Sequence, residues 1–297
     1  MRKISIYGIG GLYNYGCEAI VRGTVDFIKL LYGEKCCITY YSKNHSNDKR
    51  IAEELGISIA NISRTPTLIS RCISKVVNIL QIPITPFYEK EFEQIINESD
   101  VIISVGGDIY TIPAYRRNKE KYRYVNYLVE FGNQAIEKGK SVIIYGASIG
   151  PFGNYKKALS YYTEHFKKID TIICREQVSV DYLKSLGVTG NVVMLPDPAF
   201  LVEDEQKGIQ TEKKYVGVNL SELSLCELYG SVSEKTILKL AKLLSEIYVN
   251  TGKPLMLIPH VNSPVEVSDN DEVFLSRVFE KLPEQVKQVS ILVKPTS

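Results

Sequence analysis

The chain has 297 residues, of which 44% are hydrophobic, enough for two ordinary domains with packed cores. Lysine and arginine total 36 against 34 acidic residues, so the net charge of +2 argues against general attraction to nucleic acid or an anionic membrane, and any anion site must be local. The six cysteines, scattered apart from the adjacent Cys36 and Cys37, have no CxxC spacing and argue against a zinc or disulfide framework. No signal peptide or membrane span is predicted, so we expect a cytoplasmic protein. The absence of a His-x-x-x-His spacing or of clustered ligands predicts no metal site.

Short β-branched runs alternate with helix-length amphipathic segments, which predicts parallel sheets with crossover helices. In the first half, strands are predicted at 3–7, 36–41, 100–105, 141–147, 170–174 and 191–195, and helices at 17–31, 119–138, 155–168 and from 175 to a C-terminal Gly187. Between 42 and 90 the pattern is weaker. IAEEL is helix-like, ISIANI is short, and three prolines limit any helix in the apolar stretch 69–82.

The polar stretch EDEQKGIQTEKK has the composition of a linker, and the alternation restarts after it. Strands are predicted at 215–219, 254–259 and 289–293, with helices at 234–251 and 271–282. The fold class is therefore α/β with parallel sheets. The predicted domains are an N-terminal Rossmann-like domain (1–202), a linker (203–214) and a partial C-terminal Rossmann-like domain (215–297), since three strands make half of a doubly wound domain.

The loop after the first strand, GIGGLYNYGCEA, fits neither common phosphate fingerprint. The dinucleotide form needs a glycine at the position of Tyr13, and the triphosphate form needs lysine and a hydroxyl residue where Cys17 and Glu18 stand. Its free amides could meet a smaller anion or a sugar hydroxyl. Alternatively, the glycines only permit a tight turn and Glu18 only complements the helix dipole.

Other polar or glycine-rich segments directly follow predicted strands, where ligands of open α/β sheets bind. Gly106-Gly107-Asp108 is a close-approach turn with a carboxylate, which either contacts a ligand or caps the next segment. The stretch GPFGN, which begins at Gly150, presents backbone without bulky side chains.

Arg175 directly follows an apolar strand and precedes a helix, so its guanidinium is predicted beside helix N-terminal amides at the carboxyl edge of the sheet. This placement suits a carboxylate or phosphate ligand, and Ser179 faces the same way one helical turn later. The alternative is a salt bridge to Glu176 or Asp197.

His260 ends the stretch PLMLIPH, and we expect it to point into an interdomain cleft as a general acid or base. His45 lies in a polar loop, and His165 has a surface or packed role within an amphipathic helix. Some of the 20 tyrosines could line a sugar-binding groove, although core-edge positions explain most of them more simply.

Taken in order, seven segments of the chain resemble the polysaccharide pyruvyl transferase family: NYGCEAI, DVIISVGGDIY, YGASIGPFGN, CREQVSVDYLKSLGV, VVMLPDPAF, VGVNLSE and LIPHVN. Members of that family are similar to GT-B glycosyltransferases, with two Rossmann-like domains facing each other across a cleft. They transfer the carboxyethylidene group of phosphoenolpyruvate to two hydroxyls of a sugar in a bacterial cell-surface polysaccharide, such as a capsule or exopolysaccharide, and release phosphate.

The resemblance implies phosphoenolpyruvate as donor substrate, no cofactor, and a saccharide or lipid-linked oligosaccharide as acceptor. It leaves open a peripheral membrane association through the acceptor. A homo-oligomer is an expectation from the partial second domain, which would leave the apolar faces of 215–219 and 289–293 without cover. By motif, the candidate residues are His260 and Asp108 for catalysis, Arg175, Ser179 and Gly150 for the donor, and Asn14, Gly16, Glu18, Gly106 and Gly107 for the acceptor.

The chain departs from the family pattern in two places. Tyr15 and Cys17 differ from the NLGDEA form of the first loop, and no arginine and histidine motif of the GARxH kind occurs before Ser297. The second departure predicts a shortened, weakly active or inactive form. Two alternatives remain: a GT-B glycosyltransferase that uses a nucleotide sugar, and a non-catalytic binding protein on a degenerate transferase fold.

Overall fold

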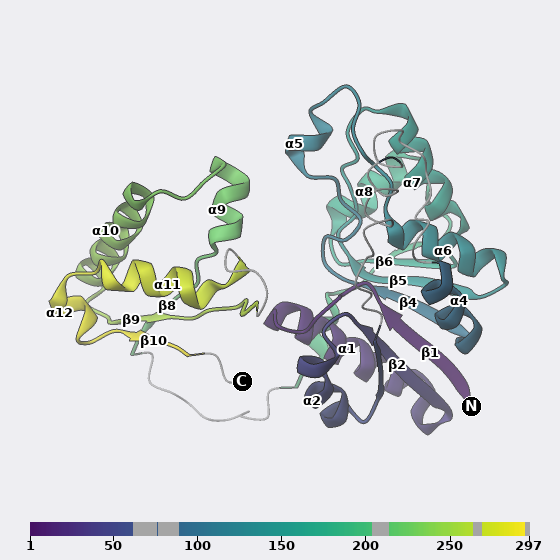
Figure 1. The fold of residues 1–297 in the computed structure, drawn as a ribbon, viewed down its shortest axis with the longest axis horizontal. Helices are drawn as coiled ribbons and strands as arrows, with labels where there is room; N and C mark the ends of the chain where they lie inside the picture. The colour runs from purple at the N-terminus through teal and green to yellow at the C-terminus, as the bar shows by residue number, and fades with distance from the viewer. Residues whose placement is uncertain (62–75, 77–88, 204–213, 264–268, 295–297) are drawn as a thin grey trace. The chain divides into compact units, whose positions relative to one another are not determined.

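The computed structural model describes residues 1–61, 76, 89–203, 214–263 and 269–294. The chain divides into two compact units. The first comprises Met1–Leu12 and Cys17–Glu203, and the second comprises Tyr13–Gly16 and Asp204–Ser297. Each unit is built on its own parallel sheet, shown in Figure 1.

The sheet of the first unit has the order β3-β2-β1-β4-β5-β6-β7, and every neighbouring pair is parallel. Strand order therefore reverses between β1 and β4, which is where open α/β sheets bind ligands. The strands are β1 (Arg2–Tyr7), β2 (Cys36–Ser42), β3 (Ser58–Asn61), β4 (Val101–Val105), β5 (Ser141–Ala147), β6 (Thr171–Cys174) and β7 (Val192–Met194).

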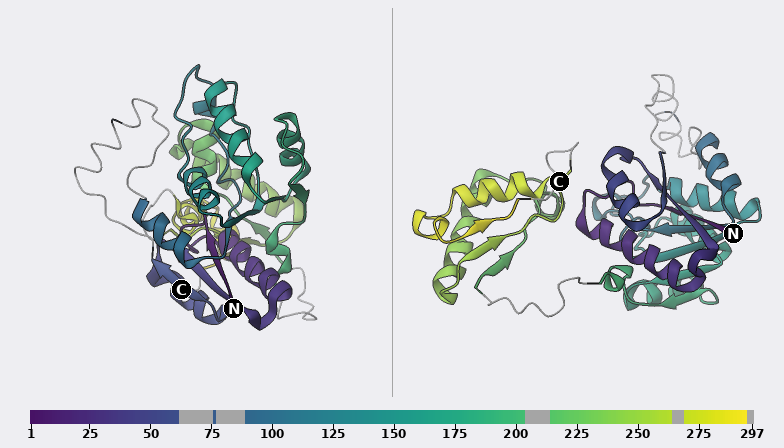
Figure 2. Two further views of the ribbon diagram at one scale, coloured as in Figure 1. Left: turned by 90° about the vertical axis from the view of Figure 1, so that its right-hand side faces the viewer. Right: turned by 90° about the horizontal axis from the view of Figure 1, so that it is seen from below.

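Helices cover both faces of this sheet and form two separate cores. Figures 1 and 2 show α1 and α2 on one face, with α4, α6 and α7 on the other. The helices are α1 (Tyr15–Tyr32), α2 (His45–Leu55), α4 (Glu89–Glu98), α5 (Ala114–Arg117), α6 (Tyr127–Glu137), α7 (Lys156–Lys168) and α8 (Gln177–Ser185), with the 3₁₀ turns η1 (Gly33–Lys35) and η2 (Pro198–Leu201). Because both faces are covered, central strands such as β4 are buried along their whole length, and all residues of β4 except Ser104 are apolar.

The predicted helix at 119–138 is wrong in its first half, because α6 begins only at Tyr127. The side chain of Asn126 caps α6 by accepting a hydrogen bond from the Leu128 amide (3.0 Å). Before it, residues 119–121 form bends and residues 122–126 form no regular element. The hydroxyl of buried Tyr122 donates to the Phe152 carbonyl, and the carbonyl of Tyr124 accepts from Tyr162. Burial of every second residue outweighs helix propensity in this segment.

The second unit has a three-stranded parallel sheet in the order β10-β9-β8. Its buried core includes Leu255 and Leu257 from β9 and Phe274 from α11. The elements are β8 (Val216–Val218), α9 (Glu222–Tyr229), α10 (Glu234–Thr251), β9 (Leu255–Leu257), α11 (Asp271–Glu280), α12 (Glu284–Lys287) and β10 (Ile291–Leu292).

The predicted order of strands and helices after the linker is confirmed, and helix 234–251 is confirmed to its ends. Both α9 and α12 are additional elements. The apolar stretch 69–82 and most of the linker lie outside the described residues. Among the described helices, none combines the length and the apolarity needed to cross a lipid bilayer.

Candidate functional site

At the point of strand reversal in the first sheet, an isoleucine side chain of the protein itself fills the space beside two glycines. Gly8 and Gly106, which follow β1 and β4, have φ values of +112° and +150°. The Ile109 side chain lies against both, and a β-carbon on Gly106 would approach it to 2.8 Å. These glycines therefore leave room for an isoleucine rather than for a pyrophosphate. Gly106, which was predicted to bind the acceptor, thus packs against the side chain of Ile109.

The glycine loop after β1 is held by hydrogen bonds that its own carbonyl and amide groups make. The Ile9 carbonyl accepts from the hydroxyl of buried Tyr40 (3.0 Å), and the Gly10 carbonyl accepts from the Lys43 amide (2.8 Å). The Leu12 amide donates to the carboxylate of fully buried Asp48 (3.0 Å). Burial raises the pKa of Asp48. A carboxyl group thus occupies the place where a phosphate would need donors, which supports rejecting both phosphate fingerprints.

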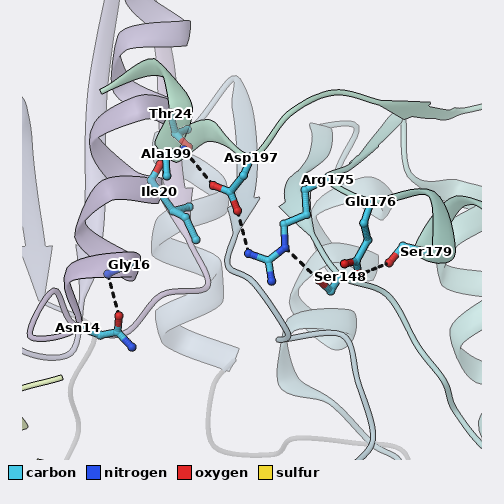
Figure 3. A network of polar contacts seen from close by, with 10 residues as sticks. All are labelled: Asn14, Gly16, Ile20, Thr24, Ser148, Arg175, Glu176, Ser179, Asp197 and Ala199. Carbon is cyan, nitrogen blue, oxygen red and sulfur yellow. Dashed lines mark hydrogen bonds and ion pairs between the residues drawn. The ribbon is translucent and has the colours of Figure 1, made fainter. Parts of the chain in front are cut away.

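Arg175, directly after β6, has a fixed guanidinium, as Figure 3 shows. Its Nε donates to the Ser148 hydroxyl (3.0 Å), and its Nη1 donates to Asp197 Oδ2 (2.8 Å). The predicted alternative of a salt bridge to Asp197 is therefore present. Within the described residues Nη2 has no hydrogen-bond partner, and the side chain keeps 29% of its surface exposed. The two N–H groups of Nη2 thus remain available to an anion.

The turn after β4 lies beside this arginine. A β-carbon on Gly107 would stand 2.9 Å from Arg175 Nη2, so only glycine lets the guanidinium lie flat against the backbone here. The Ser148 amide donates to the Gly107 carbonyl (2.6 Å), which joins this turn to the loop after β5. The next residue, Asp108, is exposed, and its carboxylate has no partner among the described residues. It caps neither α5 nor α6, whose N-cap residues are Pro113 and Asn126, so the capping alternative is wrong.

The predicted donor residues Gly150 and Ser179 support the loop after β5. Ser179 is 1% exposed, and its hydroxyl accepts from the Ile149 amide (2.8 Å) and donates to Glu176 (3.0 Å). Gly150 has φ of +76°, and any side chain there would overlap the ring of Tyr182. Both residues therefore shape the wall next to Arg175, with the Ser179 hydroxyl turned into the protein.

The position of Asp197, the partner of Arg175, is fixed by a helix-cap hydrogen bond and by the packing of the next residue, Pro198. Asp197 Oδ1 accepts from the Ala199 amide (2.9 Å), which caps η2. The next residue, Pro198, is buried between Gly23 of α1 and Gly146 of β5. A β-carbon on Gly146 would lie 2.6 Å from the proline ring, and one on Gly23 would overlap its carbonyl oxygen. Two glycines on different elements thus determine where this carboxylate stands.

His260 lies three residues beyond β9, in a loop of the second unit that one carboxylate organises. Asp271, at the start of α11, is 3% exposed, and its Oδ2 accepts from the His260 and Val261 amides (both 3.0 Å) and from the Asn219 side chain (3.4 Å). The His260 side chain is exposed, and its imidazole has no partner in the described part of the chain.

The predicted acceptor residues Asn14 and Gly16 come together with His260 in the second unit. The Tyr15 amide donates to the His260 carbonyl (3.0 Å), and Asn14 forms an antiparallel bridge with Val261. The Asn14 side chain also accepts from the Gly16 amide (2.9 Å), shown in Figure 3. A short piece of the N-terminal sequence is thus the backbone partner of the histidine loop.

Glu18 is engaged in an ion-pair chain. In the first turn of α1 it accepts from Arg22 Nε (2.7 Å), and Arg22 Nη2 donates to Glu54 (2.5 Å). The carboxylate is 17% exposed, so its predicted acceptor role competes with this pairing. His165 packs in the core, as one of its two predicted roles requires, with 1% exposure.

The structure thus gathers Gly107, Ser148, Gly150 and Arg175 in one unit, and Asn14, Gly16 and His260 in the other. Sequence reasoning missed Ser148 and Asp271. Ser148 follows a predicted strand, which was an available signal, whereas nothing local marks Asp271 as the anchor of a loop ten residues earlier. Within the described residues, no group of histidine, cysteine, aspartate or glutamate side chains is placed to hold a metal ion.

Comparison with known proteins gives a family and a fold. The family described as polysaccharide pyruvyl transferase matches residues 14–295. No curated protein matches the sequence. UDP-GlcNAc 2-epimerase from Methanocaldococcus jannaschii aligns with a TM-score of 0.55 at 12% identity, covering 99% of this chain and 74% of that chain. The enzyme from Neisseria meningitidis, solved with UDP-GlcNAc, aligns at 0.53 and 10% identity over 100% and 73%. These similarities establish a GT-B fold.

Proposed function

The chain belongs to the polysaccharide pyruvyl transferase family, and we propose that it transfers the carboxyethylidene group of phosphoenolpyruvate to two hydroxyls of a saccharide acceptor. The observation that carries this proposal is the guanidinium of Arg175, fixed on two sides by Ser148 and Asp197, with Nη2 free in the described residues. Phosphoenolpyruvate is a compact anion with a carboxylate and a phosphate. Both groups match a planar guanidinium donor.

The reaction forms two C–O bonds at the central carbon of phosphoenolpyruvate and breaks its bond to the phosphate oxygen. Of the two protons lost by the acceptor hydroxyls, one ends on the methylene carbon, which becomes a methyl group, and the other leaves with phosphate. We assign Asp108 as a base for a hydroxyl, because its carboxylate is exposed and unpartnered among the described residues. We assign His260 to proton delivery, because its imidazole is exposed and without a partner among the described residues, while Asp271 holds its backbone.

The packing after β1 disfavours a nucleotide donor at that site. Ile109 lies against Gly8 and Gly106, and the buried Asp48 carboxyl takes the Leu12 amide. The described residues after β1 therefore leave no phosphate site of the kind that a nucleotide-sugar glycosyltransferase would need at this position. The similar solved structures named UDP-GlcNAc 2-epimerase share the fold with this chain, and their ligand is a reason to test a nucleotide sugar directly.

Calorimetric titration of the full chain with phosphoenolpyruvate, and separately with UDP-GlcNAc, tests the proposal without knowledge of the acceptor. We expect binding of phosphoenolpyruvate and about 10- to 100-fold weaker binding by Arg175→Lys, which keeps the charge but loses the fork. Gly107→Ala should weaken binding similarly, because its β-carbon displaces Nη2. The control is Arg2→Lys, at the start of β1 and thus at the opposite end of the strands. Binding of UDP-GlcNAc but not of phosphoenolpyruvate would overturn the proposal.

A further inference from the structure

A strongly basic segment of the first unit has no role in the site described above. Residues 114–123 contain five cations and one carboxylate, Glu120. Two further lysines open α7. Together these make what we call the basic surface: Arg116, Arg117, Lys119, Lys121, Arg123, Lys156 and Lys157.

Alternating burial along residues 121–124 turns two of these cations outward. Lys121 and Arg123 are exposed, whereas the intervening Tyr122 and the following Tyr124 are 5% and 7% exposed. Both tyrosine rings contact Tyr155, with centroids 5.5 and 5.7 Å away, and Tyr155 directly precedes α7. The two halves of the basic surface are therefore joined by packed aromatic rings. The basic surface thus combines cations of two segments that these aromatic contacts bring together.

The charges of the basic surface are not neutralised by the rest of the described chain. None of its seven cations forms an ion pair with a carboxylate among the described residues. The whole chain carries +2, and the basic surface with Glu120 carries +6, so the remaining residues are net negative by four. Such segregation produces a local positive potential that the overall charge conceals.

We propose that the basic surface docks the protein onto an anionic phospholipid bilayer. Each cation near an anionic membrane surface raises the binding affinity about fivefold, so a cluster of this size attracts anionic headgroups strongly. Tyr115, 63% exposed and next to Arg116, adds an amphipathic ring of the kind that sits at the headgroup level. Nucleic acid is the less suitable partner, because Tyr122 and Tyr124 are buried and only Tyr115 of the three tyrosines could stack on a base.

Binding to sedimented vesicles tests this proposal and needs no substrate, so its result does not depend on the proposed reaction. The vesicles are phosphatidylcholine alone, or with about 30% phosphatidylglycerol to provide the charge. The test variant combines Lys119→Gln, Lys121→Gln and Arg123→Gln. The matched control combines Lys235→Gln, Lys239→Gln and Lys242→Gln, three exposed lysines of α10, and has the same net charge. Circular dichroism and thermal melting of both variants check that they are folded.

We expect the wild type and the control variant to bind anionic vesicles alike, and the test variant to bind about 100-fold more weakly. Raising the salt concentration from about 0.1 to about 0.5 M should release the wild type, because the attraction is screened. Equal loss in both variants, or equal binding to uncharged vesicles, would overturn the proposal. So would displacement by inorganic phosphate at constant ionic strength, which would indicate a single-anion site, or tighter binding to a DNA duplex than to anionic vesicles.

Discussion

Arg175 illustrates how far a single residue can be interpreted from its place in the sequence. An arginine between an apolar strand and a helix was predicted at the carboxyl edge of the sheet, and it lies there. Of its two predicted alternative partners, Asp197 is correct, whereas Glu176 instead accepts from Ser179. The sequence could not decide between them, because the pairing depends on β7 lying next to β6. The need for glycine at position 107 likewise depends on Arg175 lying against it, which the sequence does not show.

His165 is a second residue whose environment gives it a distinct property. Its Nδ1 lies 2.9 Å from the Asn133 side-chain oxygen, its Nε2 is buried without a partner in the described residues, and Gly132 packs against its ring. Burial, helped by the charge of Lys168, lowers the pKa of His165 to about 3. The folded protein therefore keeps this imidazole neutral at pH values where the unfolded chain, with a pKa near 6.5, is protonated.

The pKa difference of His165 predicts acid sensitivity of the fold. Its contribution to stability is complete above about pH 6.5 and is lost as the pH falls toward 3, because the unfolded state binds the additional proton. We expect the free energy of unfolding to be about 1.4 kcal/mol lower at about pH 5.5 than at about pH 7.5 from this residue alone. Urea unfolding of wild type and His165→Gln at both pH values measures it. The same pH dependence in both proteins would contradict the prediction, and His45→Gln serves as control.

At the scale of elements, a continuous apolar run or a regular helical period was sufficient to predict some elements to their ends. Strand β5 and helix α10 have the predicted limits. The prediction failed at 119–126, where Tyr122 and Tyr124 are buried in a segment without a regular element. Tyrosines at i and i+2 fit neither a helical stripe nor a strand bounded by turns, so only the tertiary contact with Tyr155 determines the conformation.

The contact of α1 with η2 depends on Gly23, a helix-interior glycine. Alanine would ordinarily stabilise such a position by about 1 kcal/mol. Here its β-carbon would overlap the carbonyl oxygen of Pro198, which is backbone and cannot rotate away. The clash opposes helix propensity, so the sign of the mutational effect distinguishes between them.

Gly23→Ala should therefore lower the free energy of unfolding by about 2 kcal/mol, as expected when a packed contact is overfilled. Urea unfolding measures the change, with Gly190→Ala as the matched control. A β-carbon on Gly190 would have no neighbouring atom within 4 Å, so this substitution should change stability by less than about 0.5 kcal/mol. A Gly23→Ala protein at least as stable as wild type would contradict the prediction, because it would show that η2 can move away from α1 without loss of stability.

At the scale of the whole molecule, the alternation of strands and helices predicted two α/β parts, whereas the pairing of distant loops was not predictable. The bridge between Asn14 and Val261 joins residues separated by most of the chain, and no local pattern marks either as a strand. The sequence did place polar residues after strands, which is why most candidate residues were found. It could not place Asp271, whose buried carboxylate orders the His260 loop through backbone amides.

In the part of the chain that the structure describes, the cores of the two units share no residue, which predicts local rather than global effects of core mutations. Phe274 is fully buried, and the described core around it comes from residues 216–292. Phe274→Ala should cost about 3–5 kcal/mol in the stability of that core. Hydrogen exchange followed by mass spectrometry should then show faster exchange in β8 and β9 and unchanged exchange in β4 and β5. Phe166→Ala, in a core of the first unit, is the reciprocal control and should reverse the pattern. Equal acceleration in both sheets would mean that the units unfold as one cooperative body.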